Sequence, residues 1–172
     1  PVSKNETQPL QYFLDSTYTD AFVVLQDGVV ITEQYFKNMS QHTPHLLNSV
    51  SKSFVGMLAG IAVDDGALVA DHLVSSYLPQ LADGAFRHTT LQTALDMTAA
   101  VAYSEDYDQR TDDFWHEAAV VGWRPDLQTD TSPRSLLDYC QQRNQTEQDE
   151  GAHFHYRTCL LYTSDAADEW RS

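Results

Sequence analysis

Ser49 and Lys52 are separated by two positions at the start of an apolar, helix-like stretch. Residues three apart lie on one face of an α-helix, about 5–6 Å apart at Cβ, so these side chains can share a hydrogen bond. A serine hydroxyl is a weak nucleophile, but a lysine whose pKa is lowered by burial can help to remove its proton. The positive potential of the helix N-terminus also favours an anionic intermediate. The spacing indicates nucleophilic catalysis by Ser49, although S-x-x-K alone also recurs by chance on solvated helices.

Two elements are predicted around this pair. Apolar residues recur at helical spacing over residues 49–65, which predicts a helix there. Gly66 follows and is suited to end this helix as a C-cap glycine. Before the helix, the Asp-Gly pair at 27–28 separates two β-branched and aromatic runs. This pattern predicts an antiparallel hairpin with strands at 21–25 and 29–36.

The rest of the chain is predicted to be mostly helical. Thr90 is a suitable N-cap and Pro133 suits the first turn of a helix. Helices are predicted at 71–78, 90–97, 113–121 and 132–142, and residues 151–156 are predicted to be extended. The expected fold class is therefore α+β, with an antiparallel hairpin followed by a mostly helical region.

Composition excludes several classes of function. The 172 residues carry 25 acidic and 10 basic side chains, a net charge of -15, which excludes nucleic-acid binding because phosphate contacts need a basic face. No apolar run approaches 18 residues, so no membrane span is predicted. Two cysteines, Cys140 and Cys159, imply no disulfide framework. His153 and His155 are expected at the surface or behind a site, because no further metal ligand is near them in sequence.

The two ends of the chain carry their own expectations. The sequence begins at Pro1 without a leader, so we expect a truncated N-terminus and leave the compartment open. The run from Cys159 to Glu169 resembles the translated sequence of a transposase sequencing adapter. Residues 159–172 are therefore expected to be a non-native tail, and residues 1–158 the N-terminal part of a hydrolase domain. The alternative for the tail is an acidic helix at 164–170.

Several motifs together resemble the class C β-lactamase-like serine hydrolases, the penicillin-recognising S-x-x-K enzymes, and within them the 6-aminohexanoate-dimer (nylon-oligomer) hydrolases. The motifs are spread from about residue 14 to residue 156. They are the segments Thr17–Phe22, Asn48–Ser53, Leu95–Met97, Tyr103–Tyr107, Gly122–Arg124 and Gly151–Thr158. The resemblance implies a β-lactamase/penicillin-binding-protein-like fold and hydrolysis of a small-molecule amide or ester through an acyl-enzyme. This chemistry needs no metal and no organic cofactor.

The resemblance also implies roles for individual residues. Ser49 is the nucleophile, and Lys52 and Tyr156 form its proton network. A phenol needs a nearby cation to act as a base at neutral pH, and Lys52 is the candidate. Tyr107 matches the position that closes over an amide substrate, with an ordinary half-buried loop tyrosine as the alternative. Thr158 stands where the family has Asn or Ser in its Tyr-x-Asn or Tyr-x-Ser motif.

The third family motif, Lys-Thr-Gly or His-x-Gly, does not occur in the sequence. In the family this motif lies on a C-terminal strand that completes the sheet and supplies the second oxyanion donor. Loss of one such donor costs about 10²–10³ in turnover. An uncovered hairpin is also weakly stable. We therefore expect the C-terminal sheet strands to be missing and the chain to be poorly stable and essentially inactive.

Three alternatives stay open. The first keeps the chemistry and changes the substrate: an esterase, a β-lactamase or a D-Ala-D-Ala carboxypeptidase. The second is a non-catalytic relative that only binds ligands, although intact Ser49, Lys52 and Tyr156 argue against it. The third is a truncated product without function, which is favoured for the chain as printed. For the gene behind it, a serine hydrolase is favoured over a binding protein, and oligomeric state stays open.

Overall fold

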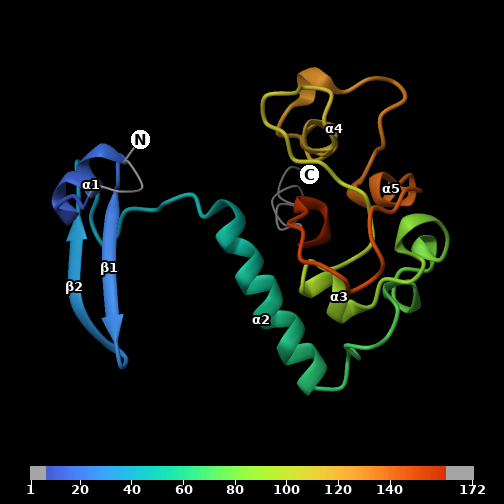
Figure 1. Cartoon of the computed structure of the whole chain (residues 1–172), viewed down its shortest axis with the longest axis horizontal. Coiled ribbons are helices and arrows are strands. Elements are labelled where there is room, and N and C mark those ends of the chain that lie inside the picture. Colours follow the sequence, from blue (N-terminus) through green and yellow to red (C-terminus); the bar gives the residue numbers. More distant parts are fainter. Residues whose placement is uncertain (1–6, 162–172) are drawn as a thin grey trace. The chain divides into compact units, whose positions relative to one another are not determined.

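The structure, a computed structural model, describes residues 7–161. The chain divides after Leu46 into two compact units. The first unit holds a helix and a hairpin, and the second holds helices α2 to α5 joined by irregular segments (Figure 1). The described part of the chain therefore has the predicted hairpin, followed by a region whose regular elements are helices and 3-10 turns joined by irregular chain.

The first unit consists of α1 (Leu10–Ser16), β1 (Ala21–Gln26) and β2 (Val29–Tyr35). The two strands pair in antiparallel fashion across a two-residue turn, with φ of +51° at Asp27 and +78° at Gly28. Two successive positive φ values belong to the type I′ turn, which matches the twist of the strands. The predicted strands are confirmed to within one residue at each end, whereas α1 was not predicted.

The hairpin leaves apolar side chains in water. Leu25, Val29 and Ile31 are 61%, 63% and 59% exposed. The two strands form a sheet of their own, with no third strand among residues 7–161. A two-stranded hairpin is at best marginally stable by itself, so the described contacts of this unit support the expectation of weak stability.

The second unit begins with the helix that carries the candidate nucleophile. A 3-10 turn at Asn48–Val50 leads into α2 (Ser51–Asp64), so Ser49 lies in the turn and not in the predicted α-helix. Gly66 ends the helix as predicted, with φ of +73° and its amide donating to the carbonyl of Val63 at 3.1 Å. Positive φ is easy for glycine because it has no Cβ.

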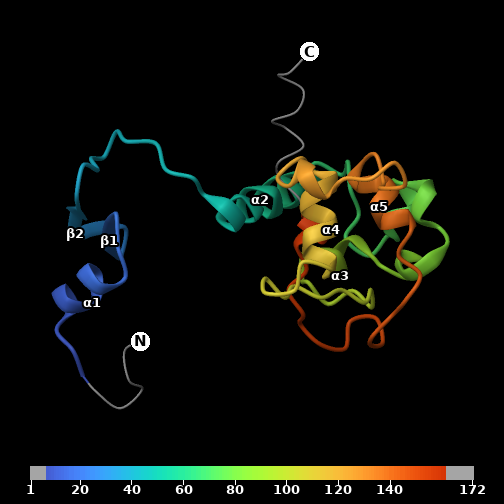
Figure 2. The same ribbon diagram turned by 90° about the horizontal axis from the view of Figure 1, so that it is seen from above.

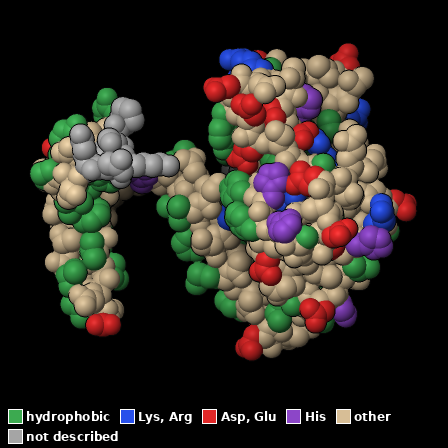
Figure 3. Space-filling view, viewed as in Figure 1, with side chains coloured by type: hydrophobic (Ala, Val, Ile, Leu, Met, Phe, Trp, Pro, Cys, Tyr) green, Lys and Arg blue, Asp and Glu red, His purple; other side chains and the backbone are tan. Residues whose placement is uncertain are grey.

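Apolar side chains of α2 also lie at the surface, in a row at helical spacing. Phe54, Met57, Leu58 and Ile61 are all more than half exposed. Figure 3 shows hydrophobic side chains over this part of the second unit. The opposite side of the helix carries Lys52, which is 8% exposed and faces the rest of the unit.

Three further helices follow: α3 (Leu91–Leu95), α4 (Asp113–Val120) and α5 (Leu136–Gln141). The predicted N-cap Thr90 is confirmed, because its hydroxyl accepts from the amide of Thr93 at 3.1 Å. The helix predicted at 113–121 is confirmed as α4.

Three of the predicted segments need correction. Residues 71–78 contain only a 3-10 turn, Val74–Ser76. The last helix begins at residue 136 and not at Pro133, because the Ser135 hydroxyl caps it by accepting from the Asp138 amide at 3.1 Å. Residues 151–156 form turns and irregular chain without strand pairing. Local sequence identified the helical regions better than their first residues, since several side chains nearby can act as caps.

A hydrophobic core fills the space between the segments of the second unit. Its buried members are Leu81, Ala85, Phe86, Ala99, Val101, Tyr103, Tyr139, Cys140 and Cys159. Cys159 belongs to a final 3-10 turn, Thr158–Leu161, which hydrogen-bonds to α2 (Figures 1 and 2). Most of the predicted tail, residues 162–172, lies outside the described residues. In the described part, none of the helices has the length and apolar character needed to cross a bilayer.

Candidate active site

Ser49 and Tyr156 meet although they are 107 positions apart in the chain. The Tyr156 hydroxyl donates a hydrogen bond to Ser49 Oγ at 2.6 Å. The residue before the nucleophile, Asn48, has φ of +46°, in the left-handed region where asparagine is among the best-tolerated residues. This backbone bend places Ser49 at an exposed position at the mouth of α2. A predicted nucleophile therefore has a predicted proton-relay group in direct contact.

Lys52 lies one turn further along and is buried. Its Nζ donates to the carbonyl oxygens of Thr158 at 2.9 Å and Leu161 at 2.7 Å. The same nitrogen lies 6.0 Å from the centre of the Tyr156 ring, within the range of a cation–π contact. Burial lowers the pKa of Lys52, and the nearby negative charge of Glu117 opposes that shift. The structure thus groups Ser49, Lys52 and Tyr156, the three predicted catalytic residues.

Tyr156 is held in place by the residue that follows it. The Arg157 side chain is fully buried and donates to the carbonyls of Val101 at 2.7 Å and Met97 at 3.3 Å. It also forms an ion pair with Glu147. A guanidinium group with its donors spread over several fixed acceptors is a rigid anchor. We infer that Arg157 fixes the backbone from which Tyr156 reaches the nucleophile.

Glu105 links the two predicted substrate-binding residues. It accepts a hydrogen bond from the Thr158 hydroxyl at 3.0 Å and another from the Tyr107 hydroxyl. Thr158 is buried, whereas Tyr107 is 60% exposed and packs edge-on against Phe114. The hydrogen bond to Glu105 raises the pKa of Tyr107 to about 12. Tyr107 is thus available at the surface near the site, while the Thr158 hydroxyl is already occupied by Glu105.

The sequence reasoning missed a buried acid behind Lys52. Glu117 of α4 is 1% exposed and accepts from the Tyr103 hydroxyl at 2.6 Å. Its other oxygen, Oε1, is buried without a hydrogen-bond partner. Burial raises the pKa of Glu117 to about 7. No sequence signal marked it, because a glutamate within a short helix is usually solvated.

The histidines and cysteines take no part in this grouping. His153 is exposed and His155 forms a hydrogen bond with Glu147, as expected of surface residues. Among residues 7–161, no cluster of His, Cys, Asp or Glu has the arrangement of a metal site. Cys140 and Cys159 are both buried free thiols.

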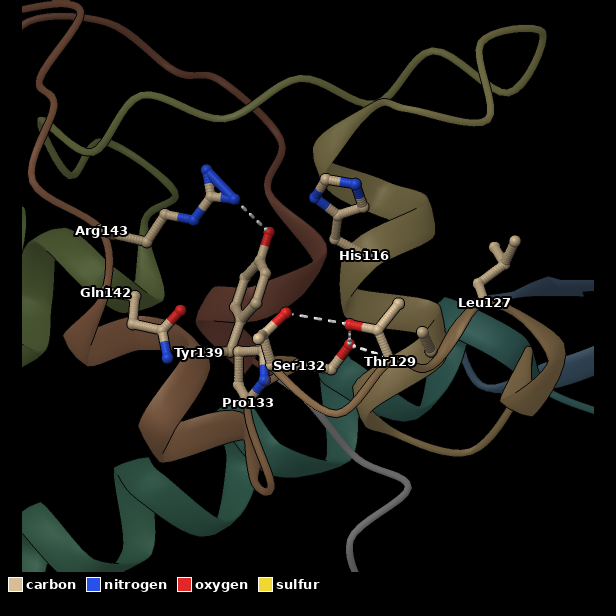
Figure 4. A pocket seen from close by; sticks show the side chains of 10 residues that line it. His116, Leu127, Thr129, Ser132, Pro133, Tyr139, Gln142 and Arg143 are labelled. Atoms are coloured by element: carbon tan, nitrogen blue, oxygen red, sulfur yellow. Dashed lines mark hydrogen bonds between the residues drawn. The ribbon is translucent and has the colours of Figure 1, made fainter.

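A separate open cavity of about 420 Å³ lies beside α4 and α5 (Figure 4). His116 projects from α4 toward it, and Arg143 donates to the Tyr139 hydroxyl at 2.7 Å on its other side. Thr129 and Ser132 also line it, and their hydroxyl groups are hydrogen-bonded to each other at 3.1 Å. None of the predicted catalytic residues lines this cavity, so it is distinct from the Ser49 site.

Comparisons with known proteins identify the family and the fold. The family model described as beta-lactamase matches residues 13–160. A 6-aminohexanoate-dimer hydrolase of Paenarthrobacter ureafaciens is 34% identical over 115 residues, 67% of this chain. The match spans only 29% of that hydrolase.

A solved structure from Bacillus anthracis, provisionally described as a 6-aminohexanoate-dimer hydrolase, superposes with a TM-score of 0.76. The superposition covers 91% of this chain and 41% of that one, at 24% sequence identity. At that identity the likeness establishes the fold. The chain thus has the fold of part of that larger protein, and it spans less than half of its length.

Proposed function

Because the chain belongs to the beta-lactamase family, we propose that it carries the acylation site of a serine hydrolase that cleaves small-molecule amides or esters. The observation that carries this proposal is the 2.6 Å hydrogen bond between Ser49 and Tyr156, with Lys52 buried one turn away. A serine that is hydrogen-bonded to a second group able to relay a proton, with a third group beside that one, has the arrangement of an activated nucleophile. A protein that only binds ligands has no need of that arrangement.

The proposed reaction has two steps. Ser49 Oγ attacks the substrate carbonyl carbon while its proton passes to the Tyr156–Lys52 pair, and that proton then leaves with the amine or alcohol. A water molecule next attacks the carbonyl carbon of the ester on Ser49 and gives one proton to the Tyr156–Lys52 pair. The bond between that carbon and Ser49 Oγ then breaks, the acid leaves, and the proton returns to Ser49 Oγ. The backbone N–H of Ser49 at the helix mouth can stabilise the oxyanion in both steps. The hydrogen bond between Tyr156 and Ser49 supports the first proton transfer, and Lys52 Nζ lies 6.0 Å from the centre of the Tyr156 ring.

For the substrate, we propose a linear amide of the 6-aminohexanoate-dimer type. Support comes from the name of the Paenarthrobacter relative and from exposed Tyr107 on the loop beside the site. A β-lactamase or D-Ala-D-Ala carboxypeptidase would use the same nucleophile and is the second candidate. Since the sequence has no Lys-Thr-Gly or His-x-Gly motif, we expect acylation of this chain to be slow and turnover to be very low.

A serine-directed fluorophosphonate tests the proposal, because labelling requires the nucleophile and its base but no second turnover step. The purified chain should be labelled at Ser49 over hours, as located by peptide mass spectrometry. Ser49→Ala should abolish labelling. Tyr156→Phe should slow it by roughly 10²–10⁴, the usual contribution of a general acid or base.

Ser51→Ala and Ser53→Ala serve as matched controls on the same helix and should label at the wild-type rate. Circular dichroism should show that each variant keeps the wild-type helix content. Labelling that persists in Ser49→Ala, or a folded wild-type chain that is never labelled, would contradict the proposed function.

A further inference from the structure

Glu117 is the most unusual charged group in the second unit. It lies on α4 within the hydrophobic core, with one carboxylate oxygen bonded to Tyr103 and the other without a partner. Buried carboxylates of this kind are rare, because an unpaired charge in the interior is costly. The proposed acylation reaction does not use Glu117 directly, so its burial needs another explanation.

Glu117 and Lys52 are both buried in the second unit, and each charge acts on the pKa of the other: the carboxylate raises that of Lys52 and the ammonium lowers that of Glu117. Glu117 is the largest charge acting on Lys52, and Lys52 is in turn the largest charge acting on Glu117. The turn Thr158–Leu161 lies between the two groups in the contact network: its carbonyls accept from Lys52, and its Cys159 belongs to the same buried core as Tyr103, which donates to Glu117. Both groups are more than nine-tenths buried, so water screens their interaction weakly.

We propose that Glu117 is a positioning residue that sets the charge of Lys52, and through it the proton transfer at Ser49. An ionised carboxylate behind the lysine favours the ammonium form, whereas a protonated carboxyl group leaves the neutral amine favoured by burial. Tyr103 supports the ionised form through its hydrogen bond. This inference rests on the proposed function for its link to catalysis, but the coupling of the two charges can be tested without it.

Other titratable groups face the pair and have to be considered in any pH experiment. Among the described residues they are Tyr103, Glu105, Tyr139, Arg143, Tyr156 and Cys159. Glu105 acts in the same direction as Glu117 on Lys52 and more weakly. It is also bonded to Thr158 and Tyr107, which makes it unsuitable as a neutral control.

The ionisation of Lys52 can be followed directly by NMR. The chain has three lysines, at positions 4, 37 and 52. With ¹³C-labelled lysine the spectrum therefore holds three Cε resonances, and the variants K4R and K37R show which one belongs to Lys52. In Glu117→Gln the midpoint of the Lys52 titration should fall by about one pH unit, the usual size of one nearby charge. Glu117→Asp retains a carboxylate and should show a smaller fall.

Glu33→Gln on the hairpin is the matched control, since it removes the same charge from a solvent-exposed position. It should leave the Lys52 midpoint within error of the wild type. If Glu117→Gln fails to fold, Tyr103→Phe replaces it. Loss of the hydrogen bond from Tyr103 keeps Glu117 protonated to higher pH, so this variant should also lower the Lys52 midpoint.

The pH profile of fluorophosphonate labelling gives the link to catalysis. Its rising limb should move to lower pH in Glu117→Gln by the same interval as the Lys52 midpoint, which a merely structural change would not produce. An unchanged Lys52 midpoint in a folded Glu117→Gln variant would overturn the inference while Ser49 labelling still stood. A shifted midpoint in a chain that is never labelled would instead leave the coupling intact and remove the proposed function.

Discussion

At the scale of residues, the candidate site combines one exposed hydroxyl with several buried ionisable groups. Ser49 is open to solvent, whereas Lys52 and Glu117 are 8% and 1% exposed. Burial acts oppositely on these two groups, lowering the pKa of the lysine and raising that of the glutamate, because it disfavours charge in both. Both shifts move the pKa values of these two groups toward neutral pH.

The raised pKa of Glu117 makes a prediction for stability. The folded state holds this proton up to a pH of about 7, whereas the unfolded chain releases it near the ordinary value of 4.5. The unfolding free energy of the wild type should therefore fall, relative to Glu117→Gln, as pH rises from 4.5 to 7, by roughly 3 kcal/mol in total. Urea unfolding of both proteins across this range measures the difference. Parallel curves for the two proteins would show that Glu117 ionises normally.

At the scale of elements, segment 144–157 positions the site through charged side chains, of which Arg157 is buried, together with backbone hydrogen bonds. Arg157 ties this segment to the backbone around Met97 and Val101. Glu150, earlier in the same segment, also ties it to the preceding part of the unit, since it accepts hydrogen bonds from the amide of Ala100 at 2.8 Å and from the hydroxyl of Thr93. Backbone hydrogen bonds add to these side-chain contacts: Thr146 forms an isolated antiparallel bridge with Val101, and the Glu147 amide donates to the Ala100 carbonyl at 3.0 Å.

Arg157→Met should destabilise the second unit by roughly 3 kcal/mol, because it leaves buried carbonyls and Glu147 without their donor. Arg157→Lys keeps the charge but loses most of the hydrogen-bond donors. Its free energy of unfolding should therefore lie between those of the wild type and Arg157→Met.

Urea unfolding followed by tryptophan fluorescence measures both variants. Arg124→Met is the matched control, since Arg124 forms an ion pair with exposed Asp126, only two positions away. This substitution should lower the free energy of unfolding by no more than about 1 kcal/mol. Equal effects at the two arginines would refute the anchoring role of Arg157.

At the scale of the whole molecule, the two units differ in how much apolar surface they bury. The second unit has a core that includes Phe86, Val101 and Tyr103, whereas the described hairpin unit has Leu14 as its one fully buried apolar residue. Apolar side chains on the hairpin and on α2 remain in water. Exposed apolar area contributes little to stability, so this chain should be held together mainly by the core of the second unit.

Native-state hydrogen exchange tests this difference. The amides that bridge β1 and β2 should exchange at least roughly tenfold faster than those of α4, because a two-stranded ladder opens without disrupting a core. Measurement by NMR at several low concentrations of denaturant would also show whether the two sets open in separate steps. Equal protection of both sets would mean that the hairpin unfolds only together with the second unit.

Local patterns predicted the hairpin, the helix after Ser49, the cap at Thr90 and the Ser49–Lys52 pair, because turn chemistry and helical spacing are properties of neighbouring residues. The same patterns placed Ser49 inside the α-helix and started the last helix at Pro133. Competing caps and a left-handed Asn48 decided those boundaries. The motif resemblance pointed to Tyr156, but its contact with a serine 107 positions away exists only in the folded chain.

The roles of Glu117 and Arg157 depended entirely on the tertiary structure. Both are charged residues of kinds that usually lie in water, and nothing in their neighbours along the chain indicates that they are buried. Burial depends on which distant segments pack over a side chain, and it is burial that moves the pKa of Glu117 and gives Arg157 its set of carbonyl partners. The sequence alone thus determined which groups could react, and packing decided which charges surround them.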